Sequence, residues 1–234
     1  MRTIAFGLLA LAACGDNLSP AADAPRPIDS APVIDGPCAV GRYVTGELLD
    51  LDSTTTALAG INNATFTQRG GTATDMTSPN GRFEMCASST TSFLFDVDAP
   101  ATHVDAIAYI EQEALGGFRP LSVRTWTLAR AQSFYTSRGL TYNPAKAHVL
   151  VQLVSDGAQL TLTGGAHDAV QTADDRTTPG TFVWQPGTTG TYVLFPNVDP
   201  AGGSVALTGD YSGVHTLPVA AGTITFAGVS VVYL

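Results

Sequence analysis

The sequence is poor in charged residues and in cysteine. Asp, Glu, Lys and Arg make up 13% of its 234 residues, and there are three cysteines. A formal net charge of −9 offers no general electrostatic attraction for nucleic acid or anionic lipid, so we expect no nucleic-acid partner. Hydrophobic residues account for 44% of the chain, enough for a packed core. Abundant Gly, Thr and Ala favour strands and turns over long helices.

The sequence signatures of common enzyme classes are also missing. None of the four histidines begins a His-x-x-Glu or His-Glu-x-x-His pattern. There is no Gly-x-Ser-x-Gly elbow, phosphate-binding loop or dinucleotide fingerprint. We therefore predict a protein that is not an enzyme and that uses no metal or cofactor.

Residues 1–13 have the form of a secretory leader, with an apolar run too short to span a bilayer. The stretch Leu11-Ala12-Ala13-Cys14 resembles a bacterial lipobox, which implies that Cys14 is acylated and anchors the protein to a membrane. The alternative is an ordinary leader followed by a chance cysteine. Because Gly15 rather than Asp follows Cys14, we expect the protein to be anchored in the outer membrane of a bacterial cell envelope. The sequence leaves open whether it faces the periplasm or the cell surface.

Residues 14–37 are expected to form a tether. Five prolines interrupt a stretch of mostly small and polar residues, and few large apolar side chains are available to offset the entropy of ordering. We predict a disordered tether that starts at the lipidated Cys14. The alternative is an edge strand through Val33 and Ile34.

The two remaining cysteines are Cys38 and Cys86. If Cys14 carries lipid, these two can pair as a disulfide in an oxidising envelope. Two free thiols are the alternative. Neither cysteine has other metal-ligating residues nearby, so a zinc site is not expected.

The chain repeats itself. The turn Thr77-Ser78-Pro79-Asn80-Gly81-Arg82-Phe83 is echoed by Thr177-Thr178-Pro179-Gly180-Thr181-Phe182, and Thr91-Ser92-Phe93-Leu94-Phe95 is echoed by Thr191-Tyr192-Val193-Leu194-Phe195. In each turn Pro and Gly favour a tight reversal that leads into a strand. Short strands separated by turn residues are typical of a sandwich or small barrel. We predict β-sandwich domains at residues 38–118 and 146–234, joined by a connector at 119–145.

The connector contains the single expected helix, at about residues 127–138. Thr127 is the expected N-cap, and Gly139 follows the end of the helix. A face for packing is formed by Leu128, Ala131, Phe134 and Tyr135.

Two strands of the second domain have distinctive patterns. Residues 147–154 form a nearly continuous apolar run and are predicted to be a buried strand. In the last strand, residues 223–234, the apolar parity changes at Ala227-Gly228. This change predicts a β-bulge.

Several of these stretches are similar to carboxypeptidase regulatory-like, or transthyretin-like, domains. They are Val44-Thr45-Gly46-Glu47-Leu48, Leu58-Ala59-Gly60-Ile61, the turn ending at Phe83, and Leu194-Phe195-Pro196-Asn197-Val198-Asp199-Pro200, which stands where that family writes an aromatic-x-Asn-Val-x-Pro-Gly turn. The resemblance implies an all-β fold of two tandem transthyretin-like Greek-key sandwiches. It also implies a non-catalytic role in binding, adhesion or structure, without specifying the ligand. We expect an envelope protein or a polysaccharide as the partner.

The weak binding candidates lie in the second domain. His167-Asp168 and Asp174-Asp175 could bind calcium or act as an acid-base pair, and the alternative is a solvated acidic loop. Trp184 and Tyr192 could stack on sugars, and the alternative is that they belong to the core. His148, inside an apolar strand, is expected at a sheet edge or in the core rather than as a ligand.

An enzyme on the same sandwich is the alternative function. The transthyretin-like family includes intradiol ring-cleavage dioxygenases, which hold iron with two Tyr and two His. The matching residue types here are Tyr192, Tyr211, His167 and His215, but their spacings match no motif. A metal-dependent enzyme, of this kind or a hydrolase, is therefore the second hypothesis.

Overall fold

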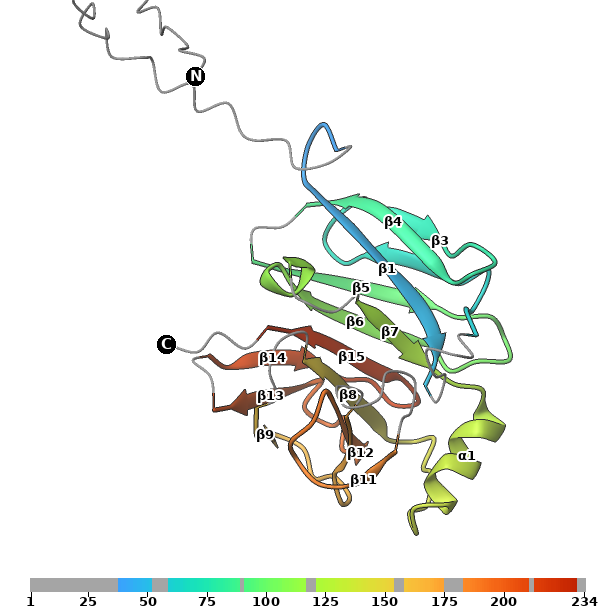
Figure 1. The fold of residues 1–234 in the computed structure, drawn as a ribbon, viewed down its shortest axis with the longest axis vertical. Helices are drawn as coiled ribbons and strands as arrows, with labels where there is room; N and C mark the ends of the chain where they lie inside the picture. Colours follow the sequence, from blue (N-terminus) through green and yellow to red (C-terminus); the bar gives the residue numbers. More distant parts are fainter. Residues whose placement is uncertain are drawn as a thin grey trace, which may run out of the picture. The chain divides into compact units, whose positions relative to one another are not determined.

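The computed structural model describes residues 38–51, 59–88, 91–116, 121–153, 158–174, 183–210 and 213–230. Cys14, the expected tether, Asp175, Tyr211 and the second turn at 177–182 lie outside these ranges. Residues from Ile34 to Leu234 form one compact unit, and strands dominate its described part (Figure 1). The elements are β1 (Arg42–Asp50), β2 (Thr65–Gln68), β3 (Thr74–Met76), β4 (Arg82–Ala87), β5 (Ser92–Asp98), β6 (Ala106–Glu111), the 3-10 helix η1 (Glu113–Gly116), β7 (Ser122–Thr125), α1 (Leu128–Thr136), β8 (Ala147–Leu153), β9 (Leu160–Thr163), β10 (Gln171–Ala173), β11 (Gln185–Pro186), β12 (Tyr192–Val198), β13 (Ser204–Gly209), β14 (His215–Pro218) and β15 (Ile224–Val229).

The described strands form three sheets. A nine-stranded sheet has the order β11-β10-β12-β8-β15-β6-β5-β2-β3, and two three-stranded sheets have the orders β4-β1-β7 and β14-β13-β9. Hydrophobic clusters lie between the sheets. The predicted all-β sandwich is therefore confirmed.

The compact unit has two halves, from β1 to β7 and from β8 to β15, which share a pattern of strand pairing. In the first half, β1 pairs antiparallel with β4 and parallel with β7. In the second half, β8 pairs in the same way with β12 and β15. The antiparallel series β2-β5-β6 likewise corresponds to β9-β13-β14. β7 lies within the stretch expected to be a connector, but it belongs to this pattern.

The sequence echo at positions 91–95 and 191–195 does not mark equivalent strands. The first stretch enters β5, which lies between β2 and β6, whereas the second enters β12, which lies between β10 and β8. By pairing, β12 corresponds to β4 instead. An apolar strand that follows a Thr can occupy either position, because its local sequence does not encode its pairing partners. The expected correspondence was therefore wrong for this pair.

The last strand, β15, connects the two halves. It pairs parallel with β8 of the second half and with β6 of the first. Its register runs from Ile224 to Val229 against β8 without a shift, so the bulge predicted at Ala227-Gly228 was wrong. The strand is buried along its whole length, so apolar side chains on both of its faces are covered. A register shift occurs instead in β12, between Phe195 and Val198.

Two hydrophobic clusters explain why the central strands are apolar throughout. In β8, Leu150 belongs to the first cluster, while Val149 and Val151 belong to the second. Every residue of β8, β12 and β15 is buried. The predicted buried strand at residues 147–154 is confirmed over 147–153.

The turn before β4 is built as its sequence predicts. The Gly81 backbone N–H donates to the Ser78 carbonyl over 2.8 Å, and Gly81 has a φ of +77°. A Cβ at Gly81 would lie 2.3 Å from the Leu48 carbonyl oxygen, so only glycine fits the close approach of the turn to β1. The Cys38–Cys86 disulfide is also present, with 5.5 Å between the two Cα atoms. It ties the residues just before β1 to β4.

The helix begins and ends close to its predicted limits. The Thr127 hydroxyl accepts a hydrogen bond from the Arg130 backbone N–H, and Gly139 follows the helix with a φ of +69°. Phe134 and Tyr135 are buried as expected, but Leu128 is 48% exposed, so its assignment to the packing face was wrong. No helix among the described residues is long and apolar enough to cross a membrane.

Candidate functional site: a polar pocket around Asn197

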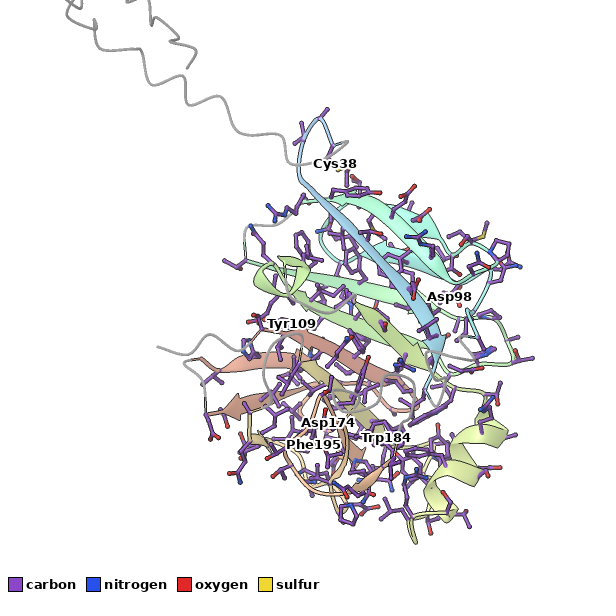
Figure 2. All side chains as sticks on the ribbon, in the orientation of Figure 1. Cys38, Asp98, Tyr109, Asp174, Trp184 and Phe195 are labelled. Carbon is purple, nitrogen blue, oxygen red and sulfur yellow. A yellow bond between two sulfur atoms is a disulfide. The ribbon has the colours of Figure 1, made fainter. Side chains whose placement is uncertain are left out.

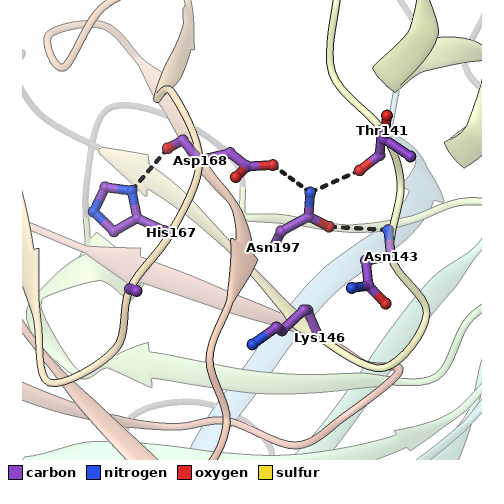
Figure 3. Close-up of a pocket in the computed structure, with 7 residues that line it drawn as sticks. Thr141, Asn143, Lys146, His167, Asp168 and Asn197 are labelled. Carbon is purple, nitrogen blue, oxygen red and sulfur yellow. Dashed lines mark hydrogen bonds between the residues drawn. The ribbon is translucent and has the colours of Figure 1, made fainter.

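Asn197 organises a pocket at the end of β12. Its φ of +50° is unusual for a residue other than glycine, and it lies within the register shift of that strand. The side-chain amide donates to the Thr141 carbonyl over 2.8 Å and to Asp168 Oδ2 over 2.5 Å, and its oxygen accepts from the Asn143 backbone N–H over 3.0 Å (Figure 3). One buried amide therefore fixes two surface segments, before β8 and before β10.

The backbone of Asn197 links the pocket to the core. Its N–H donates to His148 Nδ1 over 3.4 Å, and the Tyr135 hydroxyl lies 2.6 Å from the same nitrogen. Because the backbone N–H can only donate, Nδ1 is an acceptor, and neutral His148 carries its proton on Nε2. His148 is fully buried and stacks on Tyr142, with ring centroids 4.7 Å apart. Burial lowers the pKa of His148 to about 4, so the ring is neutral near pH 7.

An ion pair lies at the edge of the pocket. Lys146 Nζ is 3.2 Å from Asp199 Oδ2. The pKa of Asp199 is lowered, first by a hydrogen bond from the Ala201 backbone N–H and then by Lys146. Lys146 is the single lysine of the sequence.

The pocket has a cavity volume of about 350 Å³. It is lined by residues that precede β8, β10 and the end of β12: Thr141, Asn143, Lys146, Ala166, His167, Asp168 and Asn197 (Figure 3). His167 Nδ1 lies 2.8 Å from the Asp168 carbonyl oxygen, which can only accept, so Nδ1 carries a proton and Nε2 of the neutral ring is an acceptor. The pocket thus combines an ammonium, a carboxylate, amides and an imidazole.

The structure brings together two of the residues predicted for binding. His167 and Asp168 both line the pocket. Asp174 lies elsewhere, where its Oδ1 accepts a hydrogen bond from the Thr191 hydroxyl over 2.8 Å. Asp175 is outside the described residues.

The two aromatic candidates belong to the core. Trp184 is 8% exposed and packs edge-on against Phe134, and Tyr192 is 2% exposed with the Arg124 guanidinium 5.1 Å above its ring. The hypothesis that Trp184 and Tyr192 form a sugar-stacking surface was therefore wrong, because both rings are needed to fill the interior.

The residues considered for an iron site lie in separate environments. Tyr192 belongs to the first hydrophobic cluster, whereas His167 packs edge-on against Phe195, which faces the second cluster on the opposite side of β12. His215 Nδ1 lies 3.1 Å from Glu111 Oε1. Among the described residues, no group of three His, Cys, Asp or Glu side chains could hold a metal ion.

The sequence did not identify the other residues that line the pocket. Asn143 and Lys146 precede β8, and Asn197 is the residue before the last in β12, about 50 residues later in the chain. A weak signal was available in the motif Phe195-Pro196-Asn197, because Asn tolerates positive φ better than other non-glycine residues. Its role in joining separate segments required the fold.

Two other hollows are less suited to binding. One lies beside Arg69 and Asp96, which already pair with each other through several hydrogen bonds. The other lies along β3 and β4, where the Glu84 backbone N–H donates to Asp75 Oδ2. The Asn197 pocket differs in that a buried amide holds its walls together.

Fold and site together define an all-β sandwich protein with a polar surface pocket. No protein-family model matches the chain, and no curated protein matches it. Among solved structures, one described as "The Bacillus anthracis TIE protein" is 12% identical, with a TM-score of 0.25, and the match covers 81% of this chain. The chain spans 34% of the length of that structure. Similarity at this level carries no conclusion about fold or function.

Proposed function

We propose that this protein is a non-catalytic lipoprotein of the bacterial cell envelope, anchored through Cys14 and acting as a binding module. The observation that carries the proposal is the Cys38–Cys86 disulfide. Such a bond is characteristic of an oxidising compartment outside the cytosol, as the leader sequence implies. It also leaves Cys14 as the one cysteine of the chain that is not in the disulfide.

The architecture is compatible with binding while the chain is anchored. The chain enters its described part at Cys38, which Figure 2 labels in the first half, whereas the residues that line the Asn197 pocket belong to the segments next to β8, β10 and β12 in the second half. The pocket lies on connecting segments that are held by a packed sheet, the usual arrangement of binding sites on a sandwich. Outer-membrane placement, and an envelope protein or polysaccharide as partner, belong to the same proposal.

Fractionation of a bacterial host that expresses the full chain tests the anchor. The wild-type protein is expected in the membrane fraction and should incorporate a labelled fatty acid. Cys14→Ser should lose the label and leave the membrane. The matched control is the double variant Cys38→Ser/Cys86→Ser, which removes two cysteines but should stay membrane-bound. A Cys14→Ser protein that remained in the membrane fraction would refute the anchor.

Metal analysis tests the non-catalytic part of the proposal. The protein purified from envelopes is expected to contain iron, zinc and calcium well below one equivalent. A stoichiometric amount of any of these metals, lost with His167→Ala or Asp168→Ala, would support the enzymatic alternative instead.

A further inference from the structure

Four polar groups of the Asn197 pocket keep hydrogen-bonding capacity that no described residue uses. Asp168 accepts from Asn197 through Oδ2, which leaves Oδ1. His167 uses Nδ1 and leaves Nε2 as an acceptor. The Asn143 side-chain oxygen accepts from the Ala145 backbone N–H, which leaves its NH₂ group as a donor. Lys146 has two ammonium hydrogens besides the one directed at Asp199.

The charges of the pocket disfavour an ionic ligand. At the edge of the pocket Asp199 offsets the charge of Lys146, and the carboxylate of Asp168 lines the pocket, so an anion would meet a net negative site on a chain that is itself acidic. A metal cation would meet the Lys146 ammonium. A neutral ligand avoids both of these repulsions.

The arrangement of donors and acceptors selects among neutral ligands. A hydroxyl group both donates and accepts, so it can use a donor and an acceptor of the pocket at once. Sugars carry such hydroxyls on neighbouring carbons. The cavity of about 350 Å³ is at the small end of ligand sites, which span about 300 to 1,000 Å³. Its size suits one or two sugar rings.

We propose that the Asn197 pocket binds a neutral sugar through a pair of neighbouring hydroxyls. Asp168 and His167 accept from these hydroxyls, and Lys146 and Asn143 donate to them. Asn197 holds Asp168 and the Asn143 backbone in place before the ligand arrives, which reduces the entropy lost on binding. This inference rests on the proposed binding function and names its ligand class.

The single lysine provides a specific reporter of the pocket. Biosynthetic incorporation of lysine labelled with ¹³C at Cε labels Lys146 alone, and its NMR signal can be followed without modifying the ammonium group that the proposal assigns as a donor. The protein is the chain from Gly15 onward, which contains the whole compact unit. The probes are maltose, cellobiose and N,N′-diacetylchitobiose, with digalacturonate and calcium chloride as charged comparators. Concentrations of about 10 mM reveal even millimolar affinity.

Two isosteric variants test the assigned contacts. Asp168→Asn replaces the free acceptor with a donor while its oxygen can still accept from Asn197. Asn143→Asp replaces the free donor with an acceptor while it can still accept from Ala145. Each is expected to weaken binding about tenfold or more. The control Asp98→Asn removes an exposed carboxylate of β5 and should leave affinity unchanged.

The outcomes separate this inference from the proposed function. A saturable shift of the Lys146 signal with a neutral disaccharide, weakened in both pocket variants, supports the inference. Three results would overturn it: a shift of the Lys146 signal with digalacturonate or calcium but with none of the disaccharides, no shift with any of the probes, or equal sugar affinity in the wild type and both variants. The fractionation test of the Cys14 anchor is independent of all these results.

Discussion

Acid is expected to weaken the fold through His148, the buried histidine beneath the pocket. In the folded protein its pKa is lowered by burial from 6.5 to about 4. The unfolded chain therefore binds a proton at a higher pH than the folded protein does. The stabilisation from the neutral ring is complete above about pH 6.5 and is lost as the pH falls towards about 4. Below that range both states are protonated, and this residue causes no further change.

The size of the effect follows from the difference between the two pKa values. Each pH unit corresponds to about 1.36 kcal/mol. The decrease in the pKa of His148 from 6.5 to about 4 thus represents about 3 kcal/mol of stability. This is a substantial part of the roughly 5 to 15 kcal/mol that stabilises a typical domain.

Urea unfolding at a series of pH values measures the effect, and His148→Asn isolates it. The Asn oxygen can accept from the Tyr135 hydroxyl and the Asn197 backbone N–H, as Nδ1 does, but it does not titrate. Carboxylates and other histidines titrate in both proteins, so their contribution cancels in the difference. Between pH 6.5 and 4 the wild type should lose about 3 kcal/mol more than the variant. Parallel pH profiles of the two proteins would refute the assigned burial of His148.

The remaining predictions concern stability and are measured by the same urea unfolding. Reducing the disulfide, whose cysteines are 48 residues apart, should lower the free energy of unfolding by about 4 kcal/mol, and no change would mean that the native protein lacks it. Asn197→Ala removes three side-chain hydrogen bonds and places Ala at a positive φ, so it should lower the free energy of unfolding by about 3 kcal/mol. Asn63 has a similar φ of 61° without side-chain hydrogen bonds to the described residues, and Asn63→Ala should lower it by about 1 kcal/mol. Gly81→Ala should cost about 3 kcal/mol because of its contact with β1, against about 1 kcal/mol for Gly70→Ala, which has open space. Equal costs within either pair would contradict the local geometry.

Local sequence signals predicted the local elements well. The hydroxyl of Thr127 and the conformational freedom of Gly139 determine where α1 begins and ends, and both effects act within a few residues. The buried strand β8 was recognisable because its apolar run leaves no polar face. Cysteine counting proposed the disulfide without any structural information.

The pairing of strands that are far apart in the chain could not be predicted from local sequence. The stretches at 91–95 and 191–195 look alike because each is a Thr followed by the residues of an apolar strand. They nevertheless enter strands with different neighbours. Likewise, the parity change at Ala227-Gly228 suggested a bulge only on the assumption that one face of β15 is buried. Both faces are buried because Ile224 and Phe226 belong to the first hydrophobic cluster, whereas Ala227 and Val229 belong to the second. These properties depend on contacts between residues far apart in the chain.

The candidate site likewise combines residues that local sequence identified with residues that only the fold brings together. His167 and Asp168 stood out because two polar, titratable residues are adjacent in the sequence. Asn143, Lys146 and Asn197 lie in other segments, which the fold brings to His167 and Asp168 through the hydrogen bonds of the Asn197 side chain and of the backbone next to it. For Trp184 the sequence left a binding surface and the core as alternatives, because an aromatic residue between turns looks the same in both, and the structure places it in the core.

Intact mass spectrometry of the protein extracted from bacterial membranes tests the central claim most directly. The account predicts a mature chain that begins at Cys14, carries the mass of the attached acyl groups, and becomes two mass units heavier when the Cys38–Cys86 disulfide is reduced. A mature chain that starts at another residue, or a Cys14 without lipid, would contradict the proposal of an anchored envelope protein.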